Sequence, residues 1–414
     1  MNKTQDIHNY KRTLERLVER IKDTEGFSIE NKKISLGFRD ELLAQNISIS
    51  KTCRYLQNVI WLNKQFLGKN FEEANKADIK KLIADMNGSF LSEHTKKGTK
   101  VFLRKFYKFI RGVEGKGKYP EEVDWYTVTI SNSNKKIPEE LLTEKEMFDL
   151  IKVGKNDRDR ALVAVLCESG CRVGEIGSMQ IKHLTFEEHG ARITVNGKTG
   201  PRRILVIKST SYLQSWANSH PLREDMNAPL WVNNKNEILG YSSIGGILKG
   251  CAKKAGIKKR VYPHLLRHSR ATIMAKSMPE ATMKHYLGWT QSSKMAGVYI
   301  HLSGKDTDEA ILAANGIHLE KEEIESPLKP KICGRCGKIN GATDKFCGAC
   351  SLPLDEKVAN EIIKKDQQRQ EADGIMEGLM RDPEVLTLLK KKIQLNQSNK
   401  DLNLVSLNSL SLSS

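Results

Sequence analysis

A single β-rich segment in an otherwise helical sequence pattern limits most strongly what this chain can fold into. Residues 191–195 and 202–207 are rich in β-branched side chains, and the turn-forming residues 196–201 separate them, so we expect a β-hairpin. In the first 120 residues apolar side chains recur at intervals of three and four, which is typical of amphipathic helices. Helical patterns resume over about 243–314. The sequence therefore predicts a mainly α fold with a small antiparallel β-sheet, an α+β protein.

Breaks in these patterns divide the chain into segments. Glycines and a proline between 112 and 120 interrupt the helical pattern, and Thr143 with Glu146 forms a capping box that starts a new helix. A low-complexity, serine- and leucine-rich stretch ends the chain. We expect a helical domain over 1–120, a linker over 121–140, a second domain over 141–320, a small cysteine-bearing module over 331–354, a helical tail over 355–395 and a disordered tail over 396–414.

Positive charge is concentrated in two regions. The chain holds 68 Lys and Arg against 50 Asp and Glu, a net charge of +18 over 414 residues. Residues 1–120 carry 25 basic and 14 acidic side chains, residues 191–270 carry 15 and 3, and residues 321–414 carry 15 and 14. This distribution favours nucleic acid as a partner that is held by two basic surfaces, with the nearly neutral C-terminal part outside the contact. Lysines on solvated helix faces remain the alternative explanation for any single cluster.

Membrane insertion and secretion are not expected from this sequence. The longest apolar run covers about residues 161–167, far short of the ~20 residues that span a bilayer. The first residues form no apolar signal segment. We therefore expect a cytoplasmic protein with no membrane partner.

Four of the eight cysteines form two pairs with the spacing of metal ligands. Cys333 and Cys336 make one C-x-x-C pair, and Cys347 and Cys350 make the second pair after ten intervening residues. Inside a cell this pattern favours a tetrahedral Zn²⁺ site over disulfides. We expect a structural zinc ribbon, and a protein-contact role is at least as compatible with its charge as a role on DNA.

The middle domain contains the side chains that phosphoryl transfer requires. Arg172 and Glu175 lie three residues apart on one helical face, so the carboxylate can hold the guanidinium in place for two phosphate oxygens. His264 and Arg267 repeat this spacing, and Lys198 falls at the tip of the predicted hairpin. A tyrosine follows at position 299. Together these groups could stabilise transition-state charge, move protons and supply a nucleophile without a metal ion.

These motifs, taken in order, resemble those of the tyrosine recombinase (phage integrase) family. The chain shows G-x-R-x-x-E at 170–175, a hairpin lysine, H-x-x-R at 264–267, a later Trp at 289 and a tyrosine followed by Ile-His at 299–301. The specific similarity covers about 142–303, and residues 1–120 resemble the helical core-binding domain of the family more loosely. The resemblance implies a helical core-binding domain, a tyrosine-recombinase catalytic domain and an appended zinc ribbon.

The resemblance also implies a role for each matching residue. Arg172 and Arg267 would bind the scissile phosphate, Lys198 would protonate the departing 5′-oxygen, His264 would assist proton removal, and Tyr299 would form a 3′-phosphotyrosyl link. Trp289 departs from the commonest pattern, which has histidine there. Its indole N–H can donate one hydrogen bond to a phosphate oxygen but cannot shuttle a proton.

The function implied by the resemblance is site-specific recombination of double-stranded DNA by a homo-tetramer on paired sites, with no cofactor for the strand transfer. Integration, excision and resolution of DNA all fit the residues equally. Two alternatives remain at this stage. One is a type IB topoisomerase-like relaxase with the same catalytic groups, and the other is a catalytically silent, site-specific DNA-binding regulator.

Overall fold

The computed structural model describes residues 6–128, 140–197, 199–302, 315 and 326–392. The chain divides into two compact units, Met1–Glu325 and Ser326–Ser414. Two sequence predictions, the placement of Lys198 and the disorder of 396–414, lie outside the described residues.

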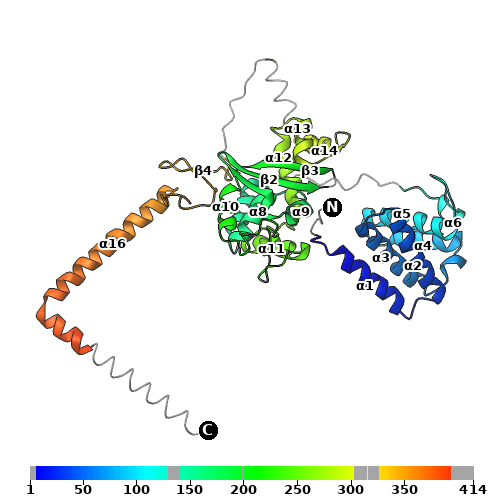
Figure 1. Cartoon of the computed structure of the whole chain (residues 1–414), viewed down its shortest axis with the longest axis horizontal. Coiled ribbons are helices and arrows are strands. Elements are labelled where there is room, and N and C mark those ends of the chain that lie inside the picture. Colours follow the sequence, from blue (N-terminus) through cyan, green and yellow to red (C-terminus); the bar gives the residue numbers. More distant parts are fainter. Residues whose placement is uncertain (1–5, 129–139, 198, 303–314, 316–325, 393–414) are drawn as a thin grey trace, which may run out of the picture. The chain divides into compact units, whose positions relative to one another are not determined.

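The first unit begins with a bundle of helices (Figure 1). Ser28 and Ser92 each cap the helix that follows them, and Asn75 forms a capping box with Asp78, so side chains satisfy the free N–H groups at these helix starts. The elements are α1 (Tyr10–Asp23), α2 (Ile29–Ala44), α3 (Ile49–Gln65), η1 (Phe71–Glu73), α4 (Lys76–Gly88), α5 (Glu93–Ile110) and α6 (Glu121–Asp124).

Aromatic packing forms the core of this bundle. Phe38 of α2 is fully buried and lies edge-on to Phe106 of α5, with 5.0 Å between ring centroids. Val123 and Tyr126 belong to the same core. The bundle therefore includes α6, within the segment 121–140 that the sequence predicts as a linker, because apolar side chains after the glycine-rich break return to the core.

The rest of the first unit is α+β, as predicted. A three-stranded antiparallel sheet has the order β1-β2-β3, and β2 and β3 form the expected hairpin with Gly197 opposite Gly200. Strand β1 was not predicted. The helices are α7 (Glu144–Lys152), α8 (Asp157–Ser169), α9 (Val173–Gly177), η3 (Ile181–His183), α10 (Thr210–Asn218), α11 (Tyr241–Lys254), α12 (Pro263–Ala275), α13 (Glu280–Leu287) and α14 (Met295–Leu302), and the strands are β1 (Leu184–Glu187), β2 (Gly190–Gly197) and β3 (Gly200–Val206).

Helix α8 lies at the centre of this α+β part. Its residues 161–169 are all buried, and it packs against α7, α10 and α12. A capping box between Thr143 and Glu146 starts α7, which confirms the predicted helix start. Gly170 ends α8 in the left-handed conformation (φ 58°), so the chain turns directly into the segment that carries Arg172.

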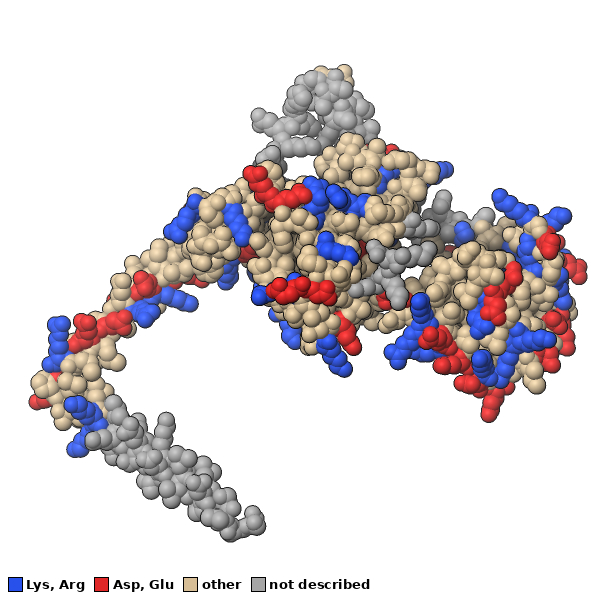
Figure 2. All heavy atoms as spheres, viewed as in Figure 1, with Lys and Arg blue, Asp and Glu red and all other residues tan. Residues whose placement is uncertain are grey.

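The second unit contains a short hairpin of β4 (Lys331–Ile332) and β5 (Ile339–Asn340), followed by the 26-residue helix α16 (Glu356–Arg381). None of the residues of α16 is buried, and its surface carries both signs of charge (Figure 2). Among the described residues, the helices are all too short or too polar to cross a membrane.

Candidate active site and cysteine cluster

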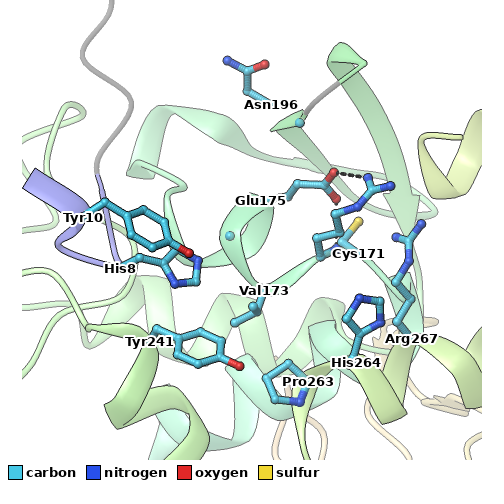
Figure 3. A pocket seen from close by; sticks show the side chains of 13 residues that line it. His8, Tyr10, Cys171, Val173, Glu175, Asn196, Tyr241, Pro263, His264 and Arg267 are labelled. Atoms are coloured by element: carbon cyan, nitrogen blue, oxygen red, sulfur yellow. Dashed lines mark hydrogen bonds and ion pairs between the residues drawn. The ribbon is translucent and has the colours of Figure 1, made fainter. Parts of the chain in front are cut away.

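A cavity of about 670 Å³ brings the predicted phosphate-binding residues together (Figure 3). Arg172 comes from the start of α9, and His264 and Arg267 come from the first turns of α12. His8, Tyr10 and Tyr241 line the same cavity. Residues far apart in the sequence therefore meet at one site.

Arg172 is fixed by Glu175 but remains accessible. Its Nη1 donates to Glu175 Oε1 over 2.9 Å, and its backbone N–H donates to Glu175 Oε2 over 2.9 Å. Nη1 also donates to the carbonyl of Gly288 over 3.3 Å. The side chain of Arg172 is 36% exposed, whereas that of Glu175 is 3% exposed. The arrangement leaves guanidinium N–H groups available to an incoming anion.

Arg267 is buried deeper in the same site. It donates from Nη1 to the carbonyl of Gly170 (3.0 Å) and from Nη2 to that of Leu287 (2.7 Å). Its guanidinium lies 5.3 Å from the ring centroid of Trp289. Burial, together with the nearby charge of Arg172, lowers the pKa of Arg267 to about 10, so the group stays positive at neutral pH.

Tyr299 of α14 is almost fully buried beside these residues. Trp289 stacks on its ring, with centroids 5.6 Å apart and planes only 4° from parallel. Burial raises the pKa of Tyr299 to about 12, and the charge of Arg267 acts in the opposite direction. The hydroxyl therefore needs a proton acceptor if it is to act as a nucleophile at neutral pH.

The hydroxyl contacts a histidine that the motifs did not predict. The hydroxyl of Tyr299 is hydrogen-bonded to Nδ1 of His268, and the ring of His264 stacks on His268 at a centroid distance of 5.1 Å. The expected base, His264, is thus one ring removed from the contact with the nucleophile. The five-residue pattern His264-Leu-Leu-Arg267-His268 carries the missed signal, because residues four apart share a helix face.

Lys198 lies outside the described residues, although its two neighbours are described. Thr199 Oγ1 donates to the carbonyl of Gly288 over 3.5 Å. A Cβ added to Gly197 would lie 2.2 Å from Glu175 Oε1, so this part of the hairpin packs directly against the group that holds Arg172. The role of Lys198 stays a prediction.

The four predicted ligand cysteines come together in the second unit. The thiol sulfurs of Cys333, Cys336, Cys347 and Cys350 all lie within 4.8 Å of one another. The sulfur separations of 3.5 Å (Cys333 to Cys350) and 3.6 Å (Cys336 to Cys347) are close to the ~3.8 Å edge of a tetrahedron with Zn–S bonds of about 2.3 Å. Backbone N–H groups of Ala349 and Cys350 lower the pKa of the Cys347 thiol. This cluster can hold one metal ion.

Comparison with known proteins agrees with the site. The model of the phage integrase family matches residues 140–305. Tyrosine recombinase XerA of Pyrococcus furiosus is 30% identical over 270 residues, which cover 63% of this chain and 88% of that protein. Tyrosine recombinase XerC of Bacillus subtilis is 28% identical over 246 residues, covering 56% and 78%.

Solved structures share the fold at low sequence identity. The Tn1549 transposon integrase in complex with a circular intermediate DNA has a TM-score of 0.52 at 18% identity, covering 67% of this chain and 99% of that one. A lambda integrase tetramer bound to a Holliday junction has a TM-score of 0.50 at 13% identity, covering 64% and 76%. These values support the predicted fold class.

The fold and the site define an enzyme of the tyrosine-type site-specific recombinases. The chain belongs to the phage integrase family of tyrosine recombinases. The comparisons favour this assignment over the topoisomerase-like and the catalytically silent alternatives. The matched residues end at 305, before the unit with the cysteine cluster begins at Ser326.

Proposed function

We propose that this recombinase breaks and rejoins double-stranded DNA through a covalent link to Tyr299. The proposal rests on the arrangement of the two arginines and the tyrosine. Arg172 and Arg267 line one cavity. The positive charge of Arg267 acts on the buried hydroxyl of Tyr299, which is hydrogen-bonded to His268. Two fixed positive charges beside a hydroxyl that is hydrogen-bonded to a histidine suit attack on a phosphodiester.

Side chains of this protein account for every bond and proton in the proposed cleavage step. The oxygen of Tyr299 forms a bond to phosphorus, its proton moves to the histidine pair on α12, and the bond from phosphorus to the 5′-oxygen breaks. Lys198 supplies the proton that turns the departing oxygen into a 5′-hydroxyl, as the family resemblance implies. The phosphotyrosyl ester keeps the free energy of the broken bond, so a 5′-hydroxyl from another strand can reverse the step.

The helical bundle and the α+β part are proposed as the two DNA-contacting domains. The charge of residues 1–120 and 191–270 supports this assignment. Assembly as a homo-tetramer on paired sites is proposed as well, since the lambda integrase that shares the fold is a tetramer on a Holliday junction. This reaction can bring about integration, excision or resolution of DNA, and we propose that it takes place in the cytoplasm.

Covalent capture tests the proposal even though the DNA sequence of the target site is not known. The full chain is incubated with sheared genomic DNA from its source organism, denatured with detergent, purified under denaturing conditions and the attached DNA sequenced. We expect one recurring sequence with the wild-type chain and none with Tyr299→Phe. Adducts spread evenly over the genome, together with relaxation of a supercoiled plasmid that lacks the site, would support the topoisomerase-like alternative.

For the cysteine cluster we propose a structural Zn²⁺ ion. Four thiolate ligands with no position left for substrate are typical of structural zinc. The expected result is one zinc per chain by elemental mass spectrometry, and a loss of that zinc in Cys347→Ser. A wild-type chain that contains no metal after purification in zinc-supplemented medium would contradict the proposal.

A further inference from the structure

A third arginine is buried behind the proposed phosphate site. Arg202 of β3 has a side chain that is only 6% exposed. Nη2 donates to Glu175 Oε2 over 2.8 Å and Nη1 donates to Glu175 Oε1 over 3.2 Å, so the arginine and the carboxylate form a bidentate pair. Nε of Arg202 also donates to the carbonyl of Tyr286 over 3.0 Å, and Nη2 donates to the thiol sulfur of Cys171 over 3.4 Å.

Arg202 and the two proposed phosphate-binding arginines donate hydrogen bonds to the same stretch of backbone. Three successive carbonyls at the end of α13, which its own helix leaves unpaired, each accept a hydrogen bond from a different arginine. The pairs are Arg202 with Tyr286 (3.0 Å), Arg267 with Leu287 (2.7 Å) and Arg172 with Gly288 (3.3 Å). Trp289, which stacks on Tyr299, follows directly.

Glycines make room for this cluster on two sides. A Cβ on Gly288 would lie 2.6 Å from Nη1 of Arg202, and a Cβ on Gly197 would lie 2.2 Å from Oε1 of Glu175. Gly288 also has a φ of +63°, which disfavours any other residue. Arg202 and Glu175 therefore fill a space that is closed by the hairpin on one side and by the end of α13 on the other.

Arg202 affects Arg172 through the charge of Glu175, to which both arginines are bonded. A buried Glu175 paired with Arg172 alone would leave a neutral pair at the phosphate site. Burial by itself raises the pKa of Glu175, but its bonds to Arg202 and Arg172 outweigh burial and hold the pKa below the usual value. With Arg202 as second partner, the three side chains carry a net charge of +1, and that charge faces the cavity through Arg172, which is the exposed member.

We propose that Arg202 is a positioning residue for strand cleavage, which compensates the charge of Glu175 and joins the β2–β3 hairpin, the Arg172 turn and the end of α13 into one rigid frame. It acts through Arg172 and does not contact the DNA, because it is buried. The inference rests on the proposed phosphate-binding role of Arg172.

The test is the single-turnover rate of covalent adduct formation on a nicked duplex that carries the captured site, at saturating DNA. Arg202→Met should cleave about 100-fold more slowly than the wild type, which is the size of effect seen when one preorganised charge donor is lost, with unchanged affinity for the duplex. Arg202→Lys keeps the charge without the fork and should fall between the two. Arg369→Met, at an exposed arginine of α16 outside both basic regions, is the control and should cleave at the wild-type rate.

A double variant separates charge compensation from packing. Arg202→Met leaves Glu175 to neutralise Arg172, whereas Arg202→Met with Glu175→Gln restores the net charge of +1 because the buried carboxylate is removed. The double variant should therefore fold and cleave at least several-fold faster than Arg202→Met. Thermal melting of each variant, followed by circular dichroism, shows whether it is folded.

Two results would overturn the inference. One is an Arg202→Met chain that cleaves as fast as Arg369→Met. The other is a folded double variant that cleaves no faster than Arg202→Met while Arg202→Lys is equally slow, since a packing role alone would give that result. A wild-type chain that forms no adduct, with Tyr299→Phe indistinguishable from it, would instead refute the proposed function on which the inference rests.

Discussion

Replacement of His268 by phenylalanine tests how the nucleophile loses its proton. His268→Phe keeps a ring of similar size between His264 and Tyr299 but removes the hydrogen-bond partner of the hydroxyl. With a pKa of about 12, only about 10⁻⁵ of Tyr299 is ionised at pH 7, compared with about 10⁻³ for an ordinary tyrosine. Burial thus slows the unassisted reaction about 100-fold, which corresponds to about 3 kcal/mol.

The expected loss of cleavage rate at pH 7 is about 10² to 10⁴-fold, the usual contribution of a positioned general base. The rate of His268→Phe should also rise about tenfold per pH unit between pH 6.5 and 8.5, because the phenolate fraction rises in that way below a pKa of about 12. The wild type has an imidazole to accept the proton and should show a shallower slope.

Single-turnover adduct formation on the nicked duplex measures both quantities, and His264→Phe serves as the paired variant. A larger loss in His268→Phe than in His264→Phe would place the first proton transfer at His268. Wild-type rates and an unchanged pH slope in His268→Phe would refute the reasoning, because Tyr299 would then ionise without this contact.

Three further outcomes are expected. Trp289→Ala removes the ring that stacks on Tyr299 and faces Arg267, so adduct formation should slow by about tenfold, whereas Trp289→Phe should retain most of the rate. Asn31→Ala removes three hydrogen bonds of a buried side chain, to Asn63, Lys69 and Phe71, and should lower the free energy of unfolding by about 2–4 kcal/mol in denaturant titrations, whereas exposed Asn87→Ala should not. Removal of metal with a chelator should unfold the cysteine module, seen by hydrogen exchange, yet leave the first cleavage rate unchanged; a loss of cleavage would place the metal in the chemistry.

The sequence predicted those parts of the fold that depend on local pattern. The hairpin followed from two β-rich runs around a turn, and the start of α7 followed from its capping box, since neighbouring residues decide both. The C-terminal limit of the first helical bundle could not be predicted from the sequence. Glycines before residue 120 suggested a linker, but Val123 and Tyr126 return to a core that only the tertiary structure defines.

In the candidate site, too, the sequence predicted the residues that local motifs mark and missed a residue that long-range packing places there. Arg172 and Arg267 were predicted because motifs mark them, and the cavity brings them together. Arg202 stands beside Arg203 on a hairpin, a pattern that local reasoning assigns to a solvated surface. Its partners, Glu175 and Tyr286, are 27 and 84 residues away, so its burial is a consequence of long-range packing that no local pattern records.

Mass spectrometry of the trapped complex tests most directly whether Tyr299 carries the covalent link to DNA. After digestion of the DNA with nuclease and of the protein with trypsin, the peptide that begins at Met295 contains a single tyrosine, Tyr299. This peptide should carry the added mass of a nucleotide 3′-phosphate, with fragment ions that place it on Tyr299. The same modification on any other residue, or an unmodified peptide from a complex that is covalently joined to DNA, would contradict this prediction.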